Sequence, residues 1–269
     1  IKEIALAKSE IIQNIKEDGY LVLNADDSYY NFHKKIALKR KLNIFSFSIK
    51  DKSSNIYLNS IKKEKSKYKV LVNINNLNKH FYLSTPYEND IKNLLAAIAI
   101  ISIFKDIRKL DNNIFFKYQI PNGRGDVSRI KLSKKNIYLI DQSYNANPLS
   151  MNSALKNFDM IKVNPSKKHL ILGDMLELGK HSKKLHLAVF KNINKTSIKN
   201  VNVIGKHMSN SFRILNKNKK GLILKNNSEI INLINNTINN NDYLMIKGSN
   251  STGLNKLTSD IKKRKINAL

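Results

Sequence analysis

Short apolar runs and amphipathic stretches alternate through the second half of the chain. The apolar runs occupy residues 136–140, 169–172, 200–204, 221–224 and 243–246. Each run precedes a stretch with apolar side chains at helical spacing, namely 149–160, 182–193, 207–215, 228–239 and 251–263. Buried parallel strands are short, apolar throughout and separated by helices. The pattern therefore predicts five strand–helix units in one parallel sheet with helices on both faces.

The first half of the chain follows a less regular order. Helical spacing at 1–16 leads into a short apolar strand at 20–23 and a helix-like stretch that ends near residue 41. Further elements are expected as strands at 43–47, 55–61, 68–74 and 80–83 and a Leu- and Ala-rich helix at 88–104. A polar connection at 121–126 with two glycines and a proline then breaks the pattern. We therefore expect two α/β domains, residues 1–122 and 123–269.

A lysine interrupts the apolar side of the first helix. Ile1, Ile4, Ile11 and Ile15 share one stripe at helical spacing, and Lys8 falls on that stripe. We expect the stripe to face inward, which would bury the amine unless its stem lets the charged end reach the surface. Because this segment reads as the middle of a helix, we also expect the chain to be a fragment of a longer protein.

Composition excludes several classes of protein. The 269 residues include no Cys, which excludes disulfide scaffolds, zinc–thiolate sites and thiol catalysis. No apolar run approaches the roughly 18 residues of a membrane-spanning helix, so no membrane insertion is expected. The sequence shows no leader-like segment either, and a cytoplasmic location is the simplest expectation.

The charge of the chain is strongly positive. Lys and Arg number 48 against 20 Asp and Glu, a formal net charge of +28. Such an excess raises the question of nucleic-acid binding. However, the lysines are spread over the whole chain and lack interleaved aromatic residues that could stack on bases. Lys, Asn and Ile share A- and T-rich codons, so a biased genome and solvated surfaces explain the excess, and no nucleic-acid partner is expected.

Three of the predicted strand-to-helix loops are rich in functional groups. They are residues 141–148, 173–179 and 247–250. The carboxyl ends of parallel strands share one edge of a sheet, and ligands bind at that edge. We therefore expect the three loops to meet. Lys247, together with free helix N-termini, suits a carboxylate or a phosphate.

Each loop also has a plainer explanation when it is read alone. Asn147 before Pro148 is a good helix cap, and Asp174 and Glu177 could be solvated loop acids. The glycine-rich run at 248–253 is not a phosphate-binding loop, because it lacks the Lys and Ser or Thr that such a loop requires.

Taken together, the motifs resemble those of the Mur ligases, which are ATP-dependent, amide-forming enzymes of peptidoglycan synthesis and cell wall biogenesis. The motifs that carry the resemblance are Ala7-Lys8-Ser9-Glu10-Ile11, Leu23-Asn24-Ala25-Asp26-Asp27, Asn93-Leu94-Leu95-Ala96-Ala97, Gly123-Arg124, Ser143-Tyr144-Asn145-Ala146-Asn147-Pro148, Leu172-Gly173-Asp174-Met175-Leu176-Glu177-Leu178-Gly179 with His186, and Lys247-Gly248-Ser249. The first and second strand-end loops are similar to those of the family member that adds D-alanyl-D-alanine.

The resemblance implies a fold and a reaction. Residues 1–122 would be the second half of a central ATP-binding domain, and residues 123–269 a C-terminal Rossmann-like ligase domain. The reaction would use ATP and Mg²⁺ to join D-alanyl-D-alanine to UDP-N-acetylmuramoyl-tripeptide through an acyl phosphate. The phosphate-binding loop and the nucleotide-sugar domain would lie upstream, so the chain alone is expected to be inactive. The enzyme is expected to be a monomer.

The resemblance also implies roles for individual residues. Lys8 matches a lysine that can become a carbamate and help to hold Mg²⁺, and Arg124 matches an arginine that meets ATP phosphates. Asn93 matches an adenine contact, and Asp141 and Tyr144 match contacts to the nucleotide. The residues expected on the dipeptide side are Asn145, Asn147, Asp174, Glu177, Lys247 and Ser249.

Some positions depart from the family pattern. Gln142 replaces a second acid before Ser143, and Asn250 stands where an Arg usually follows Lys-Gly-Ser. Two rival functions remain open from the sequence: a Lys-rich nucleic-acid-binding domain, and a regulatory relative that has lost ATP chemistry.

Overall fold

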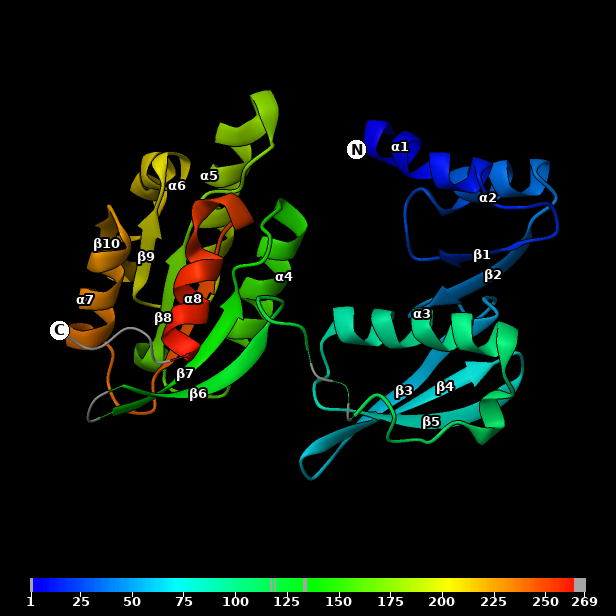
Figure 1. The fold of residues 1–269 in the computed structure, drawn as a ribbon. Helices are drawn as coiled ribbons and strands as arrows, with labels where there is room; N and C mark the ends of the chain where they lie inside the picture. The colour runs from blue at the N-terminus through cyan, green and yellow to red at the C-terminus, as the bar shows by residue number, and fades with distance from the viewer. Residues whose placement is uncertain (1, 117, 119, 133–134, 264–269) are drawn as a thin grey trace. The chain divides into compact units, whose positions relative to one another are not determined.

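The chain folds into two compact units, residues 1–118 and 119–269, in a computed structural model that describes residues 2–116, 118, 120–132 and 135–263. Both units combine helices with a sheet (Figure 1). The sequence pattern places the division after residue 122. No helix in the described ranges has the length and apolar character needed to cross a bilayer.

The first unit holds a five-stranded mixed sheet. Its strands are, in spatial order, β1 (Tyr20–Asn24), β2 (Asn43–Ser48), β3 (Ile56–Glu64), β4 (Lys67–Ile74) and β5 (Leu77–Leu83). The first three are parallel, and β3, β4 and β5 form an antiparallel meander with short turns. Helix α3 (Glu88–Phe104) lies across the sheet and buries an apolar stripe that includes Leu95 and Ile98 against Val70 and Phe81.

Helix α1 (Lys2–Gln13) buries a different face from the one predicted. Ala5 and Ile12 are buried against the part of the unit that contains α2 (Tyr30–Lys39). Ile4 and Ile11 are 60% and 67% exposed, and Lys8 is exposed as well. The buried positions are one residue later, a rotation of about 100° on a helix. The expectation that Lys8 faces inward is therefore wrong, and Ile1 lies outside the described residues.

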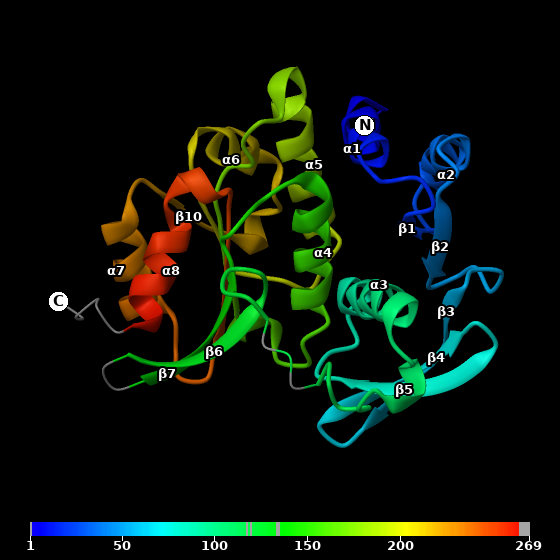
Figure 2. The same cartoon turned by 45° about the vertical axis from the view of Figure 1, so that its right-hand side comes forward.

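The second unit is a six-stranded sheet covered on both faces. The strands run in the spatial order β10 (Lys220–Leu224), β9 (Val201–Ile204), β8 (Lys168–Leu172), β11 (Tyr243–Lys247), β7 (Lys135–Gln142) and β6 (Asp126–Leu132). Helices α4 (Pro148–Asp159), α5 (Ser182–Asn194) and α6 (Lys206–Ser211) share one core with the sheet. A second core joins the sheet to α7 (Asn227–Thr237) and α8 (Leu254–Lys262). These two helices lie together on one side of the sheet in Figure 2.

The five predicted strand–helix units are present, but the sheet is not wholly parallel. The segment read as a polar connection continues into β6, which pairs antiparallel with β7 at the edge of the sheet. Its burial alternates: Val127 is 59% exposed, whereas Ile130 is 6% exposed and joins a core. An edge strand with one solvated face needs few apolar residues, so its sequence resembles that of a loop.

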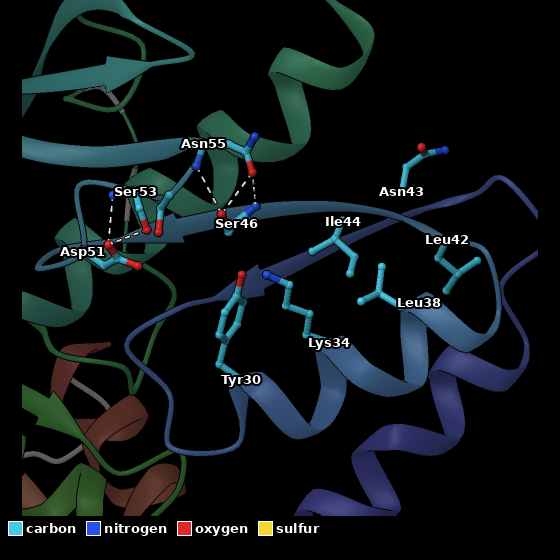
Figure 3. Close-up of a pocket in the computed structure, with 11 residues that line it drawn as sticks. Tyr30, Lys34, Leu38, Leu42, Asn43, Ile44, Ser46, Asp51, Ser53 and Asn55 are labelled. Atoms are coloured by element: carbon cyan, nitrogen blue, oxygen red, sulfur yellow. Dashed lines mark hydrogen bonds between the residues drawn. The ribbon is translucent and has the colours of Figure 1, made fainter.

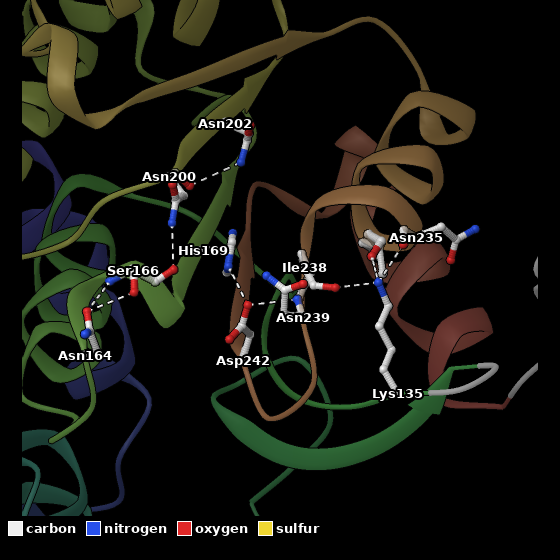
Figure 4. Close-up of polar contacts among 11 residues, drawn as sticks. Lys135, Asn164, Ser166, His169, Asn200, Asn202, Asn235, Ile238, Asn239 and Asp242 are labelled. Carbon is white, nitrogen blue, oxygen red and sulfur yellow. Dashed lines mark hydrogen bonds and ion pairs between the residues drawn. The ribbon is translucent and has the colours of Figure 1, made fainter.

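Polar contacts lie along the amino-terminal edge of this sheet (Figure 4). Lys135 Nζ donates to the carbonyl oxygens of Ile234 and Asn235 at 2.7 and 2.6 Å, and it also bonds to the carbonyl of Ile238. These bonds satisfy carbonyl groups at the end of α7 that have no partner within the helix. His169 Nε2 lies 3.0 Å from Asp242 Oδ2 between β8 and β11.

The last strand in sequence, β11, lies between β8 and β7. The helices that follow β7 and β8 pack on one face, whereas α8, which follows β11, packs on the other. The loops therefore diverge at the carboxyl end of β11. In open α/β sheets, ligands bind where neighbouring loops diverge in this way.

Candidate functional site

Lys247 ends the central strand β11 and lies inside the protein. Its side chain is 1% exposed, and Nζ donates to the backbone oxygen of Asn145 at 2.9 Å. No carboxylate of the described chain lies within 4 Å of Nζ. Burial lowers the pKa of Lys247 to about 8. The amine is thus mostly protonated at neutral pH, and it has hydrogen-bonding capacity to spare for an anion.

Ser249 ties the three strand-end loops together. Its backbone N–H donates to the Asp174 carbonyl at 3.0 Å, and its Oγ accepts from Leu176 N at 2.9 Å. The same hydroxyl lies 3.3 Å from the carbonyl of Ala146, to which it donates. One small side chain therefore fixes loop 141–148, loop 173–179 and the end of β11 to each other, as the position of these loops on one sheet edge leads us to expect.

The glycines in these loops allow close packing. A Cβ on Gly173 or on Gly248 would lie 2.7 Å from Cδ1 of Leu254, the first residue of α8. Because Leu254 is fully buried in the second core, it has little room to move. The loops can approach one another at this point only because both positions lack a side chain.

Asp141 is buried, and its carboxylate is fully engaged. Oδ1 accepts from the backbone and hydroxyl of Ser143 at 3.0 and 2.5 Å, and Oδ2 lies 2.6 Å from Lys262 Nζ. Lys262 also bonds to Asp126 at 2.6 Å. Burial alone would lower the pKa of Lys262, but its bonds to Asp126 and Asp141 raise it overall. This ion triad holds α8 against β6 and β7, so Asp141 positions its loop.

Arg124 and Tyr144 form an exposed pair at the same edge. The guanidinium carbon of Arg124 lies 4.3 Å from the centroid of the Tyr144 ring, and 47% of Tyr144 is exposed. The backbone holds the pair in register, because Tyr144 N donates to the Gly123 carbonyl at 3.1 Å. No carboxylate of the described residues pairs with Arg124. A free guanidinium next to an aromatic face can hold a phosphate.

The two asparagines of the first loop differ in their surroundings. Asn147 is the N-cap of α4: its side chain accepts from Ser150 N at 2.8 Å in a capping box. The plain explanation of this residue as a helix cap is thus observed. Asn145 is exposed, and its backbone oxygen accepts from Lys247. Its amide side chain is therefore available to a ligand.

Asp174 is not a solvated loop acid. It is 7% exposed, and its two carboxylate oxygens accept from Met208 N at 2.7 Å and His207 N at 3.1 Å. It therefore caps the start of α6 from another loop. Glu177 does lie exposed in its loop, with a φ of +61°.

His186 links loop 173–179 to helix α5 through hydrogen bonds. Its Nε2 accepts from Met175 N at 3.1 Å, and its Nδ1 lies 2.8 Å from the Ser182 carbonyl, to which it donates. Burial lowers the pKa of His186. The ring is thus neutral, with its proton on Nδ1, and it stacks on His207 with ring centroids 5.2 Å apart.

The chain matches two domain models of one protein family. The Mur ligase middle domain model matches residues 1–101, and the model for the Mur ligase, glutamate ligase domain matches residues 127–250. The chain belongs to the Mur ligase family. This Mur ligase chain is 32% identical over 268 residues to the UDP-N-acetylmuramoyl-tripeptide–D-alanyl-D-alanine ligase of Buchnera aphidicola subsp. Baizongia pistaciae. The alignment covers 96% of this chain and 54% of that protein.

Further relatives are similar to this Mur ligase chain in sequence or in fold. The protein of the same name from Rickettsia prowazekii is 28% identical, with 96% of this chain and 56% of that protein covered. MurF from Acinetobacter baumannii has the same fold, with a TM-score of 0.78 and 22% identity over 97% of this chain and 55% of that one. MurF from Thermotoga maritima, solved in complex with ADP, gives a TM-score of 0.75 at 19% identity, covering 97% and 57%. The chain spans about half the length of the relatives it matches.

The structure brings nine of the expected site residues to one edge of the second unit of this Mur ligase: Arg124, Asp141, Tyr144, Asn145, Asn147, Asp174, Glu177, Lys247 and Ser249. Lys8 and Asn93 are exposed on α1 and α3 of the first unit. The sequence shows no sign of three partners: Lys262, which pairs with Asp141; His207, which donates to Asp174; and Thr258, whose hydroxyl lies 3.0 Å from that of Ser143. They come from helices far along the chain, and their sequence context carries no motif that would reveal the contacts.

The first unit also contains a hollow that the sequence does not predict. It measures about 470 Å³, and Tyr30 and Lys34 of α2 face Ser46 and Asn55 across it (Figure 3). Ser46 N and Oγ both bond to Asn55 Oδ1, at 2.8 and 3.0 Å. The polar groups on that wall are therefore satisfied by one another.

Proposed function

We propose that this chain is the C-terminal-side part of a cytoplasmic, monomeric ligase that adds D-alanyl-D-alanine to UDP-N-acetylmuramoyl-tripeptide at the expense of ATP. The observation that carries the proposal is Lys247, a buried cation at the centre of the loop cluster that has no carboxylate partner among the described residues. Two relatives aligned over 96% of the chain are named for this reaction. Lys247 suits a substrate that carries a carboxylate, and the relatives' name points to D-alanyl-D-alanine, which carries one.

The dipeptide supplies that carboxylate at one end and its reactive amine at the other. Lys247 would hold the carboxylate, and the exposed amide of Asn145 would hold a peptide group. Because Lys247 is buried and its Nζ bonds to the Asn145 carbonyl, a carboxylate reaches it only when the backbone at Asn145 moves aside. Ser249, Asp141 and Asp174 would keep the rest of the loops in place, since their polar groups are used within the protein.

The nucleotide side of the proposal rests on Arg124. Its exposed guanidinium, stacked on Tyr144, would meet ATP phosphates. The role of Asn93 as an adenine contact stays a prediction. ATP supplies the phosphoryl group that turns the tripeptide carboxylate into an acyl phosphate. The dipeptide nitrogen then attacks the acyl carbon and loses a proton, and phosphate leaves. Such chemistry depends mainly on positioning and charge stabilisation.

Magnesium has no ready site in the described ranges. No group of three or more His, Asp or Glu side chains there could hold a metal ion. Lys8 as a carbamate ligand stays a prediction, and no step of the reaction is assigned to the ion.

Phosphate release by the full-length enzyme tests the proposal. With ATP, Mg²⁺ and UDP-N-acetylmuramoyl-tripeptide present, release should require D-alanyl-D-alanine. D-alanine alone or a diamino acid should give less than about a tenth of that rate, because neither places a carboxylate and an amine at dipeptide distance. Release with a single amino acid would assign a different substrate, and no release with any amine would favour a regulatory relative.

A further inference from the structure

Helices α5 and α6 enclose a pocket that the proposed reaction does not use. It measures about 380 Å³ and is lined by Lys183, Leu187, Lys206, His207, Asn210, Ser211 and Arg213. This volume falls within the range of small-molecule sites. Leu187 provides an apolar wall, and Asn210 and Ser211 provide neutral polar groups. We call it the α5–α6 pocket.

The charge of this pocket has one sign. Lys183, Lys206 and Arg213 line it, and no acid is among its lining residues. None of these three cations has a carboxylate within 4 Å in the part of the chain that the structure describes. Unpaired cations that line a hollow favour a ligand with several negative charges.

One wall of the pocket is bonded to the candidate site. His207 N donates to Asp174 Oδ2 at 3.1 Å, and the His207 ring stacks on His186. His186 in turn accepts from Met175 N, and the Asp174 carbonyl accepts from Ser249 N. A ligand that moves His207 would therefore move the loop that packs against Lys247-Gly248-Ser249.

We propose that the α5–α6 pocket binds a small, multiply charged phosphate compound, and that its occupancy is transmitted through His207 to loop 173–179. Lys206 and Arg213 bind the phosphate groups, and Lys183 closes the site from α5. This inference concerns a second site and does not depend on which amine the ligase uses.

Pyrophosphate titration of the 269-residue chain, followed by amide NMR at constant ionic strength, tests the proposal. We expect saturable shifts at His207 and at Met175. The double variant Lys206→Ala/Arg213→Ala should weaken binding at least tenfold. The matched variant Lys184→Ala/Lys191→Ala removes two charges from exposed positions on α5 outside the pocket and should change binding less than twofold.

Three results would overturn the proposal. Equal weakening by both double variants would mean that pyrophosphate senses only the overall positive charge. Shifts that do not saturate would mean that no site exists. Saturable binding that shifts the amide signal of His207 but not that of Met175 would reject the link to loop 173–179. All four substituted residues are exposed, so we expect both double variants to keep the wild-type melting temperature. That measurement shows that the variants fold.

Discussion

Lys247 carries a positive charge where water cannot reach it. Burial moves its pKa from 10.5 to about 8, which costs about 3 kcal/mol of unfolding free energy at pH 7. Lys247→Met keeps most of the stem and removes the charge, but it also loses the bond to the Asn145 carbonyl. We expect this variant to raise the unfolding free energy by about 1–3 kcal/mol at pH 7.

The stabilisation by Lys247→Met depends on pH, because burial lowers the pKa of Lys247. Below pH 8 the folded protein holds the buried charge, and the cost is complete. Between pH 8 and 10.5 the unfolded state binds the extra proton, so the wild type gains stability and the difference from Lys247→Met shrinks. Urea unfolding at pH 7 and pH 10 measures this change. A Met variant that is less stable at pH 7 than the wild type would mean that the buried charge of Lys247 does not destabilise the fold. Exposed Lys184→Met serves as the control.

Lys8 offers a test at a surface position. Because its side chain is exposed on α1, Lys8→Ala should leave the melting temperature within about 1 °C of the wild-type value. If Lys8 forms the carbamate ligand, turnover by the full-length enzyme should fall at least tenfold, and added bicarbonate should not restore it. Lys2→Ala on the same helix is the matched control. Unchanged turnover would make Lys8 an ordinary surface lysine.

At the scale of elements, Gly205 shows how a loop depends on a missing side chain. It precedes α6 with φ 102° and ψ 156°, a region almost restricted to glycine. A Cβ there would lie 2.6 Å from the Asp174 carboxylate that caps the helix. Gly205→Ala should therefore cost about 2–4 kcal/mol of unfolding free energy, through strain and loss of the cap.

Gly253 provides the matched control for this prediction. It also has a positive φ, 78°, but nothing lies within 4 Å of a Cβ placed there. Gly253→Ala should cost only the backbone strain, about 1 kcal/mol. Denaturant unfolding compares the two variants. Equal losses would mean that the contact with Asp174 contributes nothing.

The elements that the sequence predicts well are those with strong periodicity. The strand–helix units of the second domain follow from apolar runs such as those of β8, which is buried along its whole length, and β11, which is buried from its second residue on. Strand β6 escapes prediction because only one of its faces packs inward. The buried face of α1 is also misplaced, because small Ala5 gives a weaker signal than exposed Ile4 and Ile11.

The candidate site was predictable only in part, because topology follows from the sequence pattern and contacts between distant residues do not. Parallel strands force their carboxyl ends together, so the meeting of the three loops follows from topology. The partners that fix the loops come from distant helices: Lys262 reaches Asp141 across 121 positions, and His207 reaches Asp174 across 33. Sequence spacing carries no information about such contacts.

At the scale of the whole molecule, buried histidines make stability depend on acid. Burial lowers the pKa of both His169 and His186, so both are neutral in the folded state. As pH falls below 6.5, the unfolded state takes up protons first, and stability is lost. Each histidine contributes at most about 1.4 kcal/mol per pH unit.

Urea unfolding between pH 7.5 and 5 measures this loss. The double variant His169→Gln/His186→Gln should show a shallower pH dependence than the wild type. Exposed His181→Gln should keep the wild-type dependence. A double variant that loses stability with acid as steeply as the wild type would place the responsible groups elsewhere.

We propose that the carboxyl edge of the second unit selects the amine substrate. Steady-state kinetics of Lys247→Met in the full-length enzyme test it most directly, because this variant is expected to fold at least as well as the wild type. The KM for D-alanyl-D-alanine should rise at least tenfold, equivalent to about 1.4 kcal/mol. The KM for ATP should change less than twofold. An unchanged dipeptide KM, or a rise in the ATP KM alone, would place the dipeptide site in another part of the enzyme.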